Sequence, residues 1–155
     1  APEGALPQIQ QLLASASEDR RVAACELAAV WRLQPAAPAI RDLAAGVTMK
    51  SYPVRTAAIR ALARLGEAPE RFTGWLQDSQ ENWLIRVAAL GALAEVQPAR
   101  AGSEAAALLD GLAAHDEASL IAALTPLLAR PAATQALAKA LETKPCSKET
   151  AGRVQ

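Results

Sequence analysis

The sequence has few of the residues that build β-sheets or aromatic cores. Phe, Trp and Tyr together make up only 3% of its 155 residues. Alanine is instead the commonest residue, and it loses almost no side-chain freedom when it enters a helix. Because 52% of the residues are hydrophobic, the chain can still bury a continuous core. We therefore expect an all-α protein whose helices pack closely through small side chains.

An excess of charge of either sign is also missing. Sixteen basic residues balance sixteen acidic residues, which gives a formal net charge of zero. Proteins that bind phosphate backbones or anionic lipid surfaces usually carry a positive excess. No apolar run reaches the length of about 18 residues that spans a bilayer, and residues 1–5 lack the basic and apolar parts of a signal peptide. The sequence therefore predicts neither nucleic acid nor a membrane as a partner.

Catalytic and metal-binding side chains are scarce as well. His115 is the single histidine, and it stands beside Asp116 and Glu117 in a predicted turn. A metal ligand or general base would need partners, but there is no second histidine and no suitably spaced cysteine. No Cys-x-x-Cys-His motif for attaching a c-type haem is present. We predict no catalytic residue, metal site or cofactor, and we do not expect an enzyme.

One short pattern recurs four times along the chain. It contains two adjacent alanines followed by apolar residues at helical spacing, and its copies begin at Arg21, Arg55, Arg86 and Leu120. The starts are 34, 31 and 34 residues apart, and a period of about 20 to 50 residues is typical of stacked repeats. Cys25 occupies an apolar position of the pattern, so we expect it to be a small buried hydrophobe.

Each repeat is predicted to form two amphipathic helices, with the alanine pair in the second. A single pair cannot bury its apolar stripe alone, so the pairs must stack on their neighbours. Ser17 and Ser51 are expected N-caps, and Gly46 and Gly66 are expected to follow helix ends. We expect one domain over residues 1–142, followed by a polar linker or tail over 143–155. The predicted helices of the domain are 6–15, 17–33, 36–46, 51–65, 68–77, 80–96, 103–114, 117–129 and 131–142.

Three arginines recur near the starts of the second helices, where the helix dipole does not favour a cation. Arg21, Arg55 and Arg86 could donate hydrogen bonds to carbonyls of the turns, or to nearby acids such as Asp19, Asp78 and Glu81. Alternatively, they could form a basic stripe that contacts an acidic partner. That stripe would be extended by Arg60 and Arg64.

The three tryptophans have two possible roles. They are Trp31, Trp75 and Trp83, and the last two fall on apolar positions on either side of one turn, which favours packing in the core. A tryptophan exposed on a binding surface would instead be a strong anchor, because Trp and Arg dominate the energetics of interfaces. The candidate partner-binding residues are therefore Arg55, Arg60, Arg64, Arg86 and Trp83.

Two stretches of the sequence resemble the second helix of a HEAT repeat, of the short type found in phycobilin-lyase-like proteins. Residues 52–66 and 82–93 both carry the signature apolar-Arg-x-x-Ala-x-x-Ala-Leu. The first copy departs from it with Arg20 in place of Val, and the fourth with Leu120 in place of Arg. The resemblance implies a right-handed α-α superhelix, a HEAT/armadillo-like solenoid of about four helix pairs plus a closing helix. It also implies a non-catalytic scaffold that binds another protein, or a neighbouring domain, on its concave face.

Two other functions are open at this stage. Residues 127–131, 140–142 and 153–154 are similar to the HEAT segment of large exported bacterial proteins that combine a propeller-type dehydrogenase with a c-type haem domain. That resemblance implies a structural spacer in an exported, periplasmic protein. The phycobilin-lyase likeness implies a chaperone for a bilin chromophore. The chain begins without Met, so we expect a piece of a longer protein, and its oligomeric state is left open.

Overall fold

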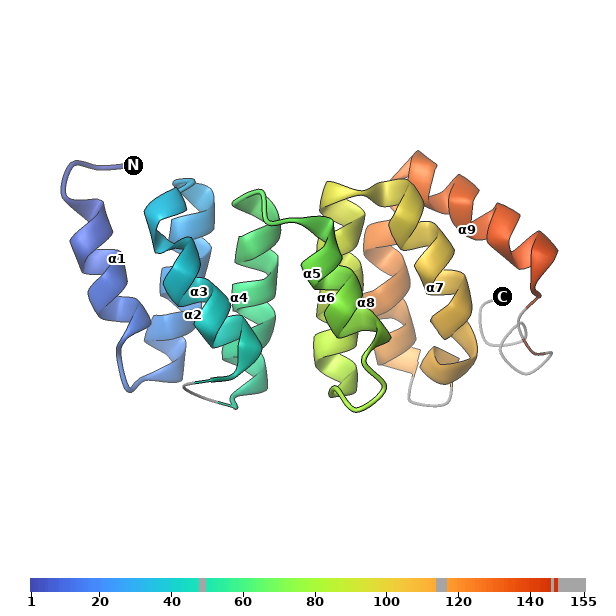
Figure 1. Cartoon of the computed structure of the whole chain (residues 1–155), viewed down its shortest axis with the longest axis horizontal. Coiled ribbons are helices and arrows are strands. Elements are labelled where there is room, and N and C mark those ends of the chain that lie inside the picture. Colours follow the sequence, from blue (N-terminus) through green and yellow to red (C-terminus); the bar gives the residue numbers. More distant parts are fainter. Residues whose placement is uncertain (48–49, 114–116, 146, 148–155) are drawn as a thin grey trace. The chain divides into compact units, whose positions relative to one another are not determined.

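The protein is all-helical over the residues that the structure describes, which confirms the predicted fold class. The computed structural model describes residues 1–47, 50–113, 117–145 and 147, and within them it contains nine α-helices, one short 3-10 helix and no strand (Figure 1). The chain divides into two compact units, Ala1–Arg71 and Phe72–Gln155. Each unit is described separately below.

Unit 1 is built from two antiparallel pairs of helices. It contains α1 (Ala5–Leu13), α2 (Glu18–Val30), the 3-10 helix η1 (Gln34–Ala36), α3 (Ala37–Ala45) and α4 (Tyr52–Arg64). α1 packs against α2, α3 packs against α4, and the second helices α2 and α4 pack against each other. The expected helix pairs are therefore present in this unit.

Local signals at the helix ends explain most of these boundaries. The side chain of Ser17 caps α2 by accepting a hydrogen bond from the backbone N–H of Arg20, as predicted. Gly46 ends α3 with a φ of 73°, a left-handed conformation that glycine adopts without a steric penalty. Ser51 occupies the N-cap position of α4, but its hydroxyl does not cap the helix, so that part of the prediction is wrong.

The second helix of the first pair is shorter than expected. The prediction extended it to Leu33, whereas α2 ends at Val30. Arg32 adopts a positive φ of 50°, which an L-residue cannot repeat along a right-handed helix. The chain therefore leaves the helix before Pro35 and enters η1.

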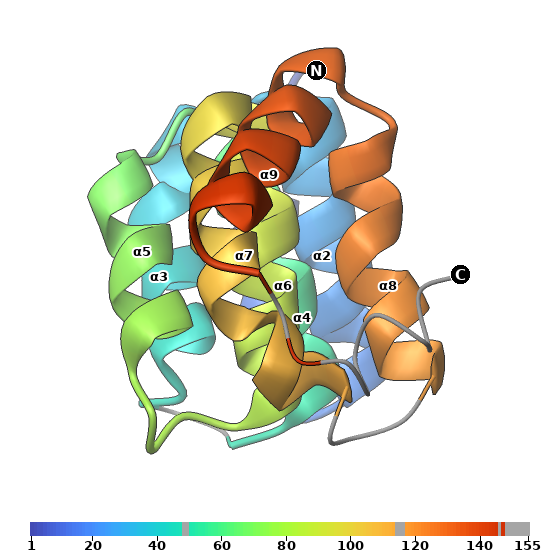
Figure 2. The ribbon, with the colours of Figure 1, turned by 90° about the vertical axis from the view of Figure 1, so that its right-hand side faces the viewer.

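Unit 2 contains most of the remaining helices. α5 (Pro69–Gln77) begins just before the division between the units, and α6 (Trp83–Val96), α7 (Pro98–Ala113), α8 (Glu117–Leu128) and α9 (Pro131–Thr143) follow. α6 packs against α7 and α8, while the predicted closing helix α9 packs most extensively against α7 (Figure 2). α7 begins at Pro98 rather than at residue 103, because proline suits the first turn of a helix, where its missing N–H would have no partner.

The alanine pattern fills the cores of both units. The second alanine of each copy has an exposed fraction of 0%, and a residue without bulk beyond Cβ lets neighbouring helices approach closely. Those alanines are Ala24, Ala58, Ala89 and Ala123. The residue that follows each of them is also buried, including Cys25. Burial, together with the negative charge of Glu26, raises the pKa of the Cys25 thiol to about 12. The prediction that Cys25 is a buried hydrophobe is confirmed.

One glycine permits a close contact between two helices in unit 2. A Cβ atom added to Gly102 on α7 would lie 2.2 Å from the carbonyl oxygen of Ala133 and 2.9 Å from the backbone nitrogen of Leu137, both on α9. Backbone atoms cannot relieve such a clash by a change of side-chain rotamer. α9 can therefore dock on α7 at this distance only because residue 102 has no side chain.

Among the described residues, no single helix has the length and apolar character to cross a membrane. Two consecutive segments, Leu120–Leu128 and Pro131–Thr143, would together satisfy those criteria, but they are bent by 117° relative to each other.

Candidate functional site

The recurring arginines form equivalent hydrogen bonds in three successive helix pairs. In each pair the Nε of the arginine donates to a backbone carbonyl near the end of the first helix. Such carbonyls have no partner within their own helix and lie at the negative end of its dipole. The predicted hydrogen bonds from these arginines to backbone carbonyls are therefore present, although only the acceptor of Arg21 lies in the turn and the other two acceptors lie in the last turn of the first helix. The three bonds join Arg21 to Ser15, Arg55 to Ala44 at 2.9 Å, and Arg86 to Leu76 at 2.9 Å.

Arg55 lies inside unit 1 and not on its surface. Its exposed fraction is 7%, and its Cδ and Nε atoms lie where a Cβ on Gly46 would approach within 3.2 Å. Gly46 therefore has two functions, since it ends α3 and leaves room for the arginine that binds that helix. Arg86 is half-buried, and its guanidinium lies 5.7 Å from the centre of the Trp83 ring, within the range of a cation–π contact.

Arg60 and Arg64 have a different environment, because both are exposed on α4. They are four residues apart and so lie on one face of the helix. Arg55 precedes Arg60 by five positions, which at about 100° per residue places it about 140° away around the helix. The structure therefore does not bring the five candidate residues together. The helical periodicity of the sequence is sufficient to predict that Arg55 lies on a different face of α4 from the other two arginines.

A groove runs between α2 and α4 in unit 1. It has a volume of about 300 Å³, and its lining residues are Glu26, Ala29, Val30, Ala57, Arg60, Ala61 and Arg64. The three alanines are buried and form its floor, whereas the charged residues and Val30, with an exposed fraction of 65%, form its rim. The groove thus combines a shallow apolar floor with two guanidinium groups. Sequence reasoning found Arg60 and Arg64 but missed the contribution of Val30.

The rim residues occupy equivalent positions in the repeat. Five residues after the recurring arginine, the copies carry Glu26, Arg60 and Gly91; nine residues after it, they carry Val30, Arg64 and Glu95. Charge and size change freely at these positions, although the hydrogen-bonding arginine and the second alanine are the same in all three copies. Packing constrains the buried positions of a repeat, whereas its exposed positions can differ to suit a ligand.

No protein-family model, curated protein or solved structure matches this chain. Among the described residues, no three His, Cys, Asp or Glu side chains gather in a group that could hold a metal ion. His115, Asp116 and most of the predicted tail over 143–155 lie outside the described residues.

The tryptophans are neither fully buried nor fully exposed. Trp31, Trp75 and Trp83 are all half-buried. Trp75 packs beside Phe72 with ring centres 6.2 Å apart and planes inclined by 54°, a tilted arrangement that aromatic pairs favour. Trp83 begins α6 and contacts Arg86. None of the three lines the groove of unit 1.

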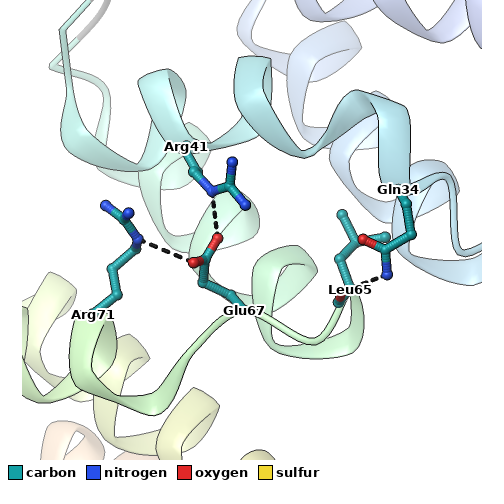
Figure 3. Close-up of polar contacts among 5 residues, drawn as sticks. All are labelled: Gln34, Arg41, Leu65, Glu67 and Arg71. Atoms are coloured by element: carbon teal, nitrogen blue, oxygen red, sulfur yellow. Dashed lines mark hydrogen bonds and ion pairs between the residues drawn. The ribbon is translucent and has the colours of Figure 1, made fainter.

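An ionic cluster that the sequence analysis missed fixes the loop after α4 to α3. The carboxylate of Glu67 accepts a hydrogen bond from Arg41 Nε at 2.5 Å and forms an ion pair with Arg71 Nε at 3.3 Å (Figure 3). In the same loop, the carbonyl of Leu65 accepts a hydrogen bond from the side-chain amide of Gln34 at 2.6 Å. Burial of Glu67 opposes its charged form, but hydrogen bonds and positive charge from Arg41 and then Arg71 outweigh burial, so the pKa of Glu67 is lowered. Gln34 and Arg41 are distant in sequence from the loop that holds Leu65 and Glu67, and only the folded structure brings them together.

Proposed function

We propose that this protein is a non-catalytic repeat scaffold, a right-handed HEAT-like superhelix, that binds a partner protein or a neighbouring domain of its own polypeptide. The observation that carries the proposal is the groove between α2 and α4, with buried alanines below and Arg60, Arg64 and exposed Val30 at its rim. An apolar floor with a charged rim is the usual composition of a protein-binding surface.

The repeated arginine contacts support the superhelical part of the proposal. A repeated internal packing would produce equivalent arginine-to-carbonyl hydrogen bonds of the kind seen in three successive pairs. Helix-pair repeats that pack alike generally stack regularly, so we expect their second helices to form an extended surface. A surface of that kind suits extended ligands such as peptide segments or the face of another domain.

Site-specific photo-crosslinking in the full-length polypeptide, in the cells that produce it, tests the proposal. A photoreactive residue in place of Val30 reports on the groove, and one in place of Val47, an equally apolar residue with an exposed fraction of 75% outside the groove lining, is the matched control. We expect a discrete crosslinked product from position 30 and none from position 47. A product between two proteins identifies a partner, and a product within one polypeptide identifies an interdomain contact.

Equal and diffuse crosslinking from both positions would contradict the proposal. The crosslinked peptides, identified by mass spectrometry, distinguish the two versions of the function. A contact within one polypeptide would favour the spacer role, in which the helices orient the domains on each side.

A further inference from the structure

The chemistry of the groove defines the kind of segment that it can hold. Its lining contributes two arginines and one glutamate, so the local charge is positive although the whole chain is neutral. At physiological salt, charges interact over about 8 Å. The charges that line the groove therefore act on a ligand more strongly than the average charge of the protein does.

The arginines are arranged to bind carboxylates. Their spacing of four residues places the two side chains on the same face of α4, and both line the groove. Each guanidinium can bind a carboxylate through two parallel hydrogen bonds. Arg60 is exposed and makes no hydrogen bond or ion pair with the part of the chain that the structure describes. It therefore need not break an existing contact to bind a ligand.

The rest of the groove is suited to one apolar side chain. Ala29, Ala57 and Ala61 leave a shallow depression because none of them extends beyond Cβ. The exposed side chain of Val30 stands beside this floor, and covering it would remove apolar surface from water. The volume of about 300 Å³ is at the lower limit for small-molecule pockets, about 300 to 1,000 Å³. This size favours a side chain presented by a peptide over an entire cofactor.

We propose that the groove between α2 and α4 binds an acidic peptide segment that carries a bulky apolar residue, with carboxylates on Arg60 and Arg64 and the apolar side chain on the alanine floor beside Val30. This inference rests on the proposed function and specifies its ligand. A basic segment would meet two arginines on one wall. A nucleic acid would find too few cations in the groove, since the strength of binding to phosphate backbones grows with the number of phosphates neutralised.

Fluorescence polarisation with the full chain tests this inference directly. The probe is a short labelled peptide of Glu and Ala with a central Leu. The comparison peptides replace Glu with Lys, or Leu with Ser, and a labelled single-stranded oligonucleotide tests for nucleic acid. We expect only the Glu/Leu peptide to bind well, with affinity that falls as salt is added and falls about tenfold or more when Leu is replaced.

Matched variants locate the binding. Arg60→Glu/Arg64→Glu should weaken binding about tenfold or more, and Arg60→Lys/Arg64→Lys should restore part of it. Arg20→Glu/Lys50→Glu makes the same change in charge at exposed positions outside the groove lining, and it should bind like the parent. Circular dichroism and urea midpoints confirm that each variant is folded.

Three results would overturn the inference: equal binding of the Lys peptide, binding of the oligonucleotide in preference to the Glu/Leu peptide, or unchanged binding by the Arg60→Glu/Arg64→Glu variant. If the peptide fails while position 30 still crosslinks to a partner, the proposed function stands and only the acidic ligand is wrong. If position 30 gives no specific crosslink and the peptide also fails, both proposals are wrong.

Discussion

Replacement of Gly102 by alanine tests how α9 docks on α7. The added Cβ would lie 2.2 Å from the carbonyl oxygen of Ala133, so the two helices must separate by about 1 Å to reach an ordinary contact distance. Overpacking of this kind costs about 1 to 3 kcal/mol. Alanine is favoured over glycine within a helix by about 0.5 to 1 kcal/mol, which offsets part of that cost. Because the clash is with backbone, we place the overpacking cost at its upper end and expect a net destabilisation of about 2 kcal/mol.

Urea denaturation followed by circular dichroism measures this effect. Gly111→Ala is the matched control, because Gly111 lies on the same helix and a Cβ there would meet nothing within 4 Å. The control should be neutral or more stable by up to about 1 kcal/mol. The two units can unfold separately, so tryptophan fluorescence should be recorded in a Trp31→Phe background, where the emission comes only from Trp75 and Trp83 of unit 2. If Gly102→Ala matches the control in stability, the close approach of α7 and α9 is wrong.

Three further predictions follow from the buried contacts. Arg55→Met should destabilise unit 1 by about 1 to 3 kcal/mol in urea denaturation, because it leaves the carbonyl of Ala44 without the donor now 2.9 Å away. The control Arg60→Met, on the exposed face, should change stability by less than about 0.5 kcal/mol. Equal effects of the two substitutions would contradict the assigned burial of Arg55. The folded pKa of Glu67 is lowered, so its stabilising contribution is complete above the ordinary Glu pKa of about 4.3 and is lost as the pH falls through the lowered value. The difference in urea midpoint between the parent and Glu67→Gln should therefore shrink on acidification below about pH 4, and a difference that is independent of pH would refute the ionic clamp. The pKa of the Cys25 thiol is raised to about 12, so in the Cys146→Ser variant, where Cys25 is the remaining thiol, it should resist a thiol reagent while the protein is folded and react after unfolding. Rapid reaction of the folded variant would show that Cys25 is accessible.

The helical content, and the pairing of helices in unit 1, could be predicted because their determinants are local. Ser17 caps α2 and Gly46 ends α3 through contacts within a few residues, so the sequence signal and the structure coincide. The arginine contacts could also be anticipated, since their recurrence at one repeat position implied a common role. The end of α2 could not, because the positive φ of Arg32 has no marker such as glycine in the sequence.

The missed features depend on partners that are distant in sequence. Gly102 directly precedes the predicted helix over 103–114, and its lack of a side chain matters only because α9, about 30 residues later, packs against it. The Glu67 cluster likewise joins residues from α3, the loop after α4 and the start of α5. Hydrophobic periodicity describes which face of a helix is buried, but it does not specify which helix covers that face.

Arg55 is buried, whereas Arg60 and Arg64 on the same helix are exposed, and this difference in burial determines which variants can test the binding surface. A variant that reversed Arg55 together with Arg60 and Arg64 would place a carboxylate in a buried site that faces the carbonyl of Ala44. An unpaired buried charge is among the few changes that can cost more than about 4 kcal/mol, so lost binding in that variant would report unfolding. Restricting the reversal to Arg60 and Arg64 leaves the hydrogen bond between the helices intact. A loss of binding then reports on the groove itself, because only exposed side chains have changed.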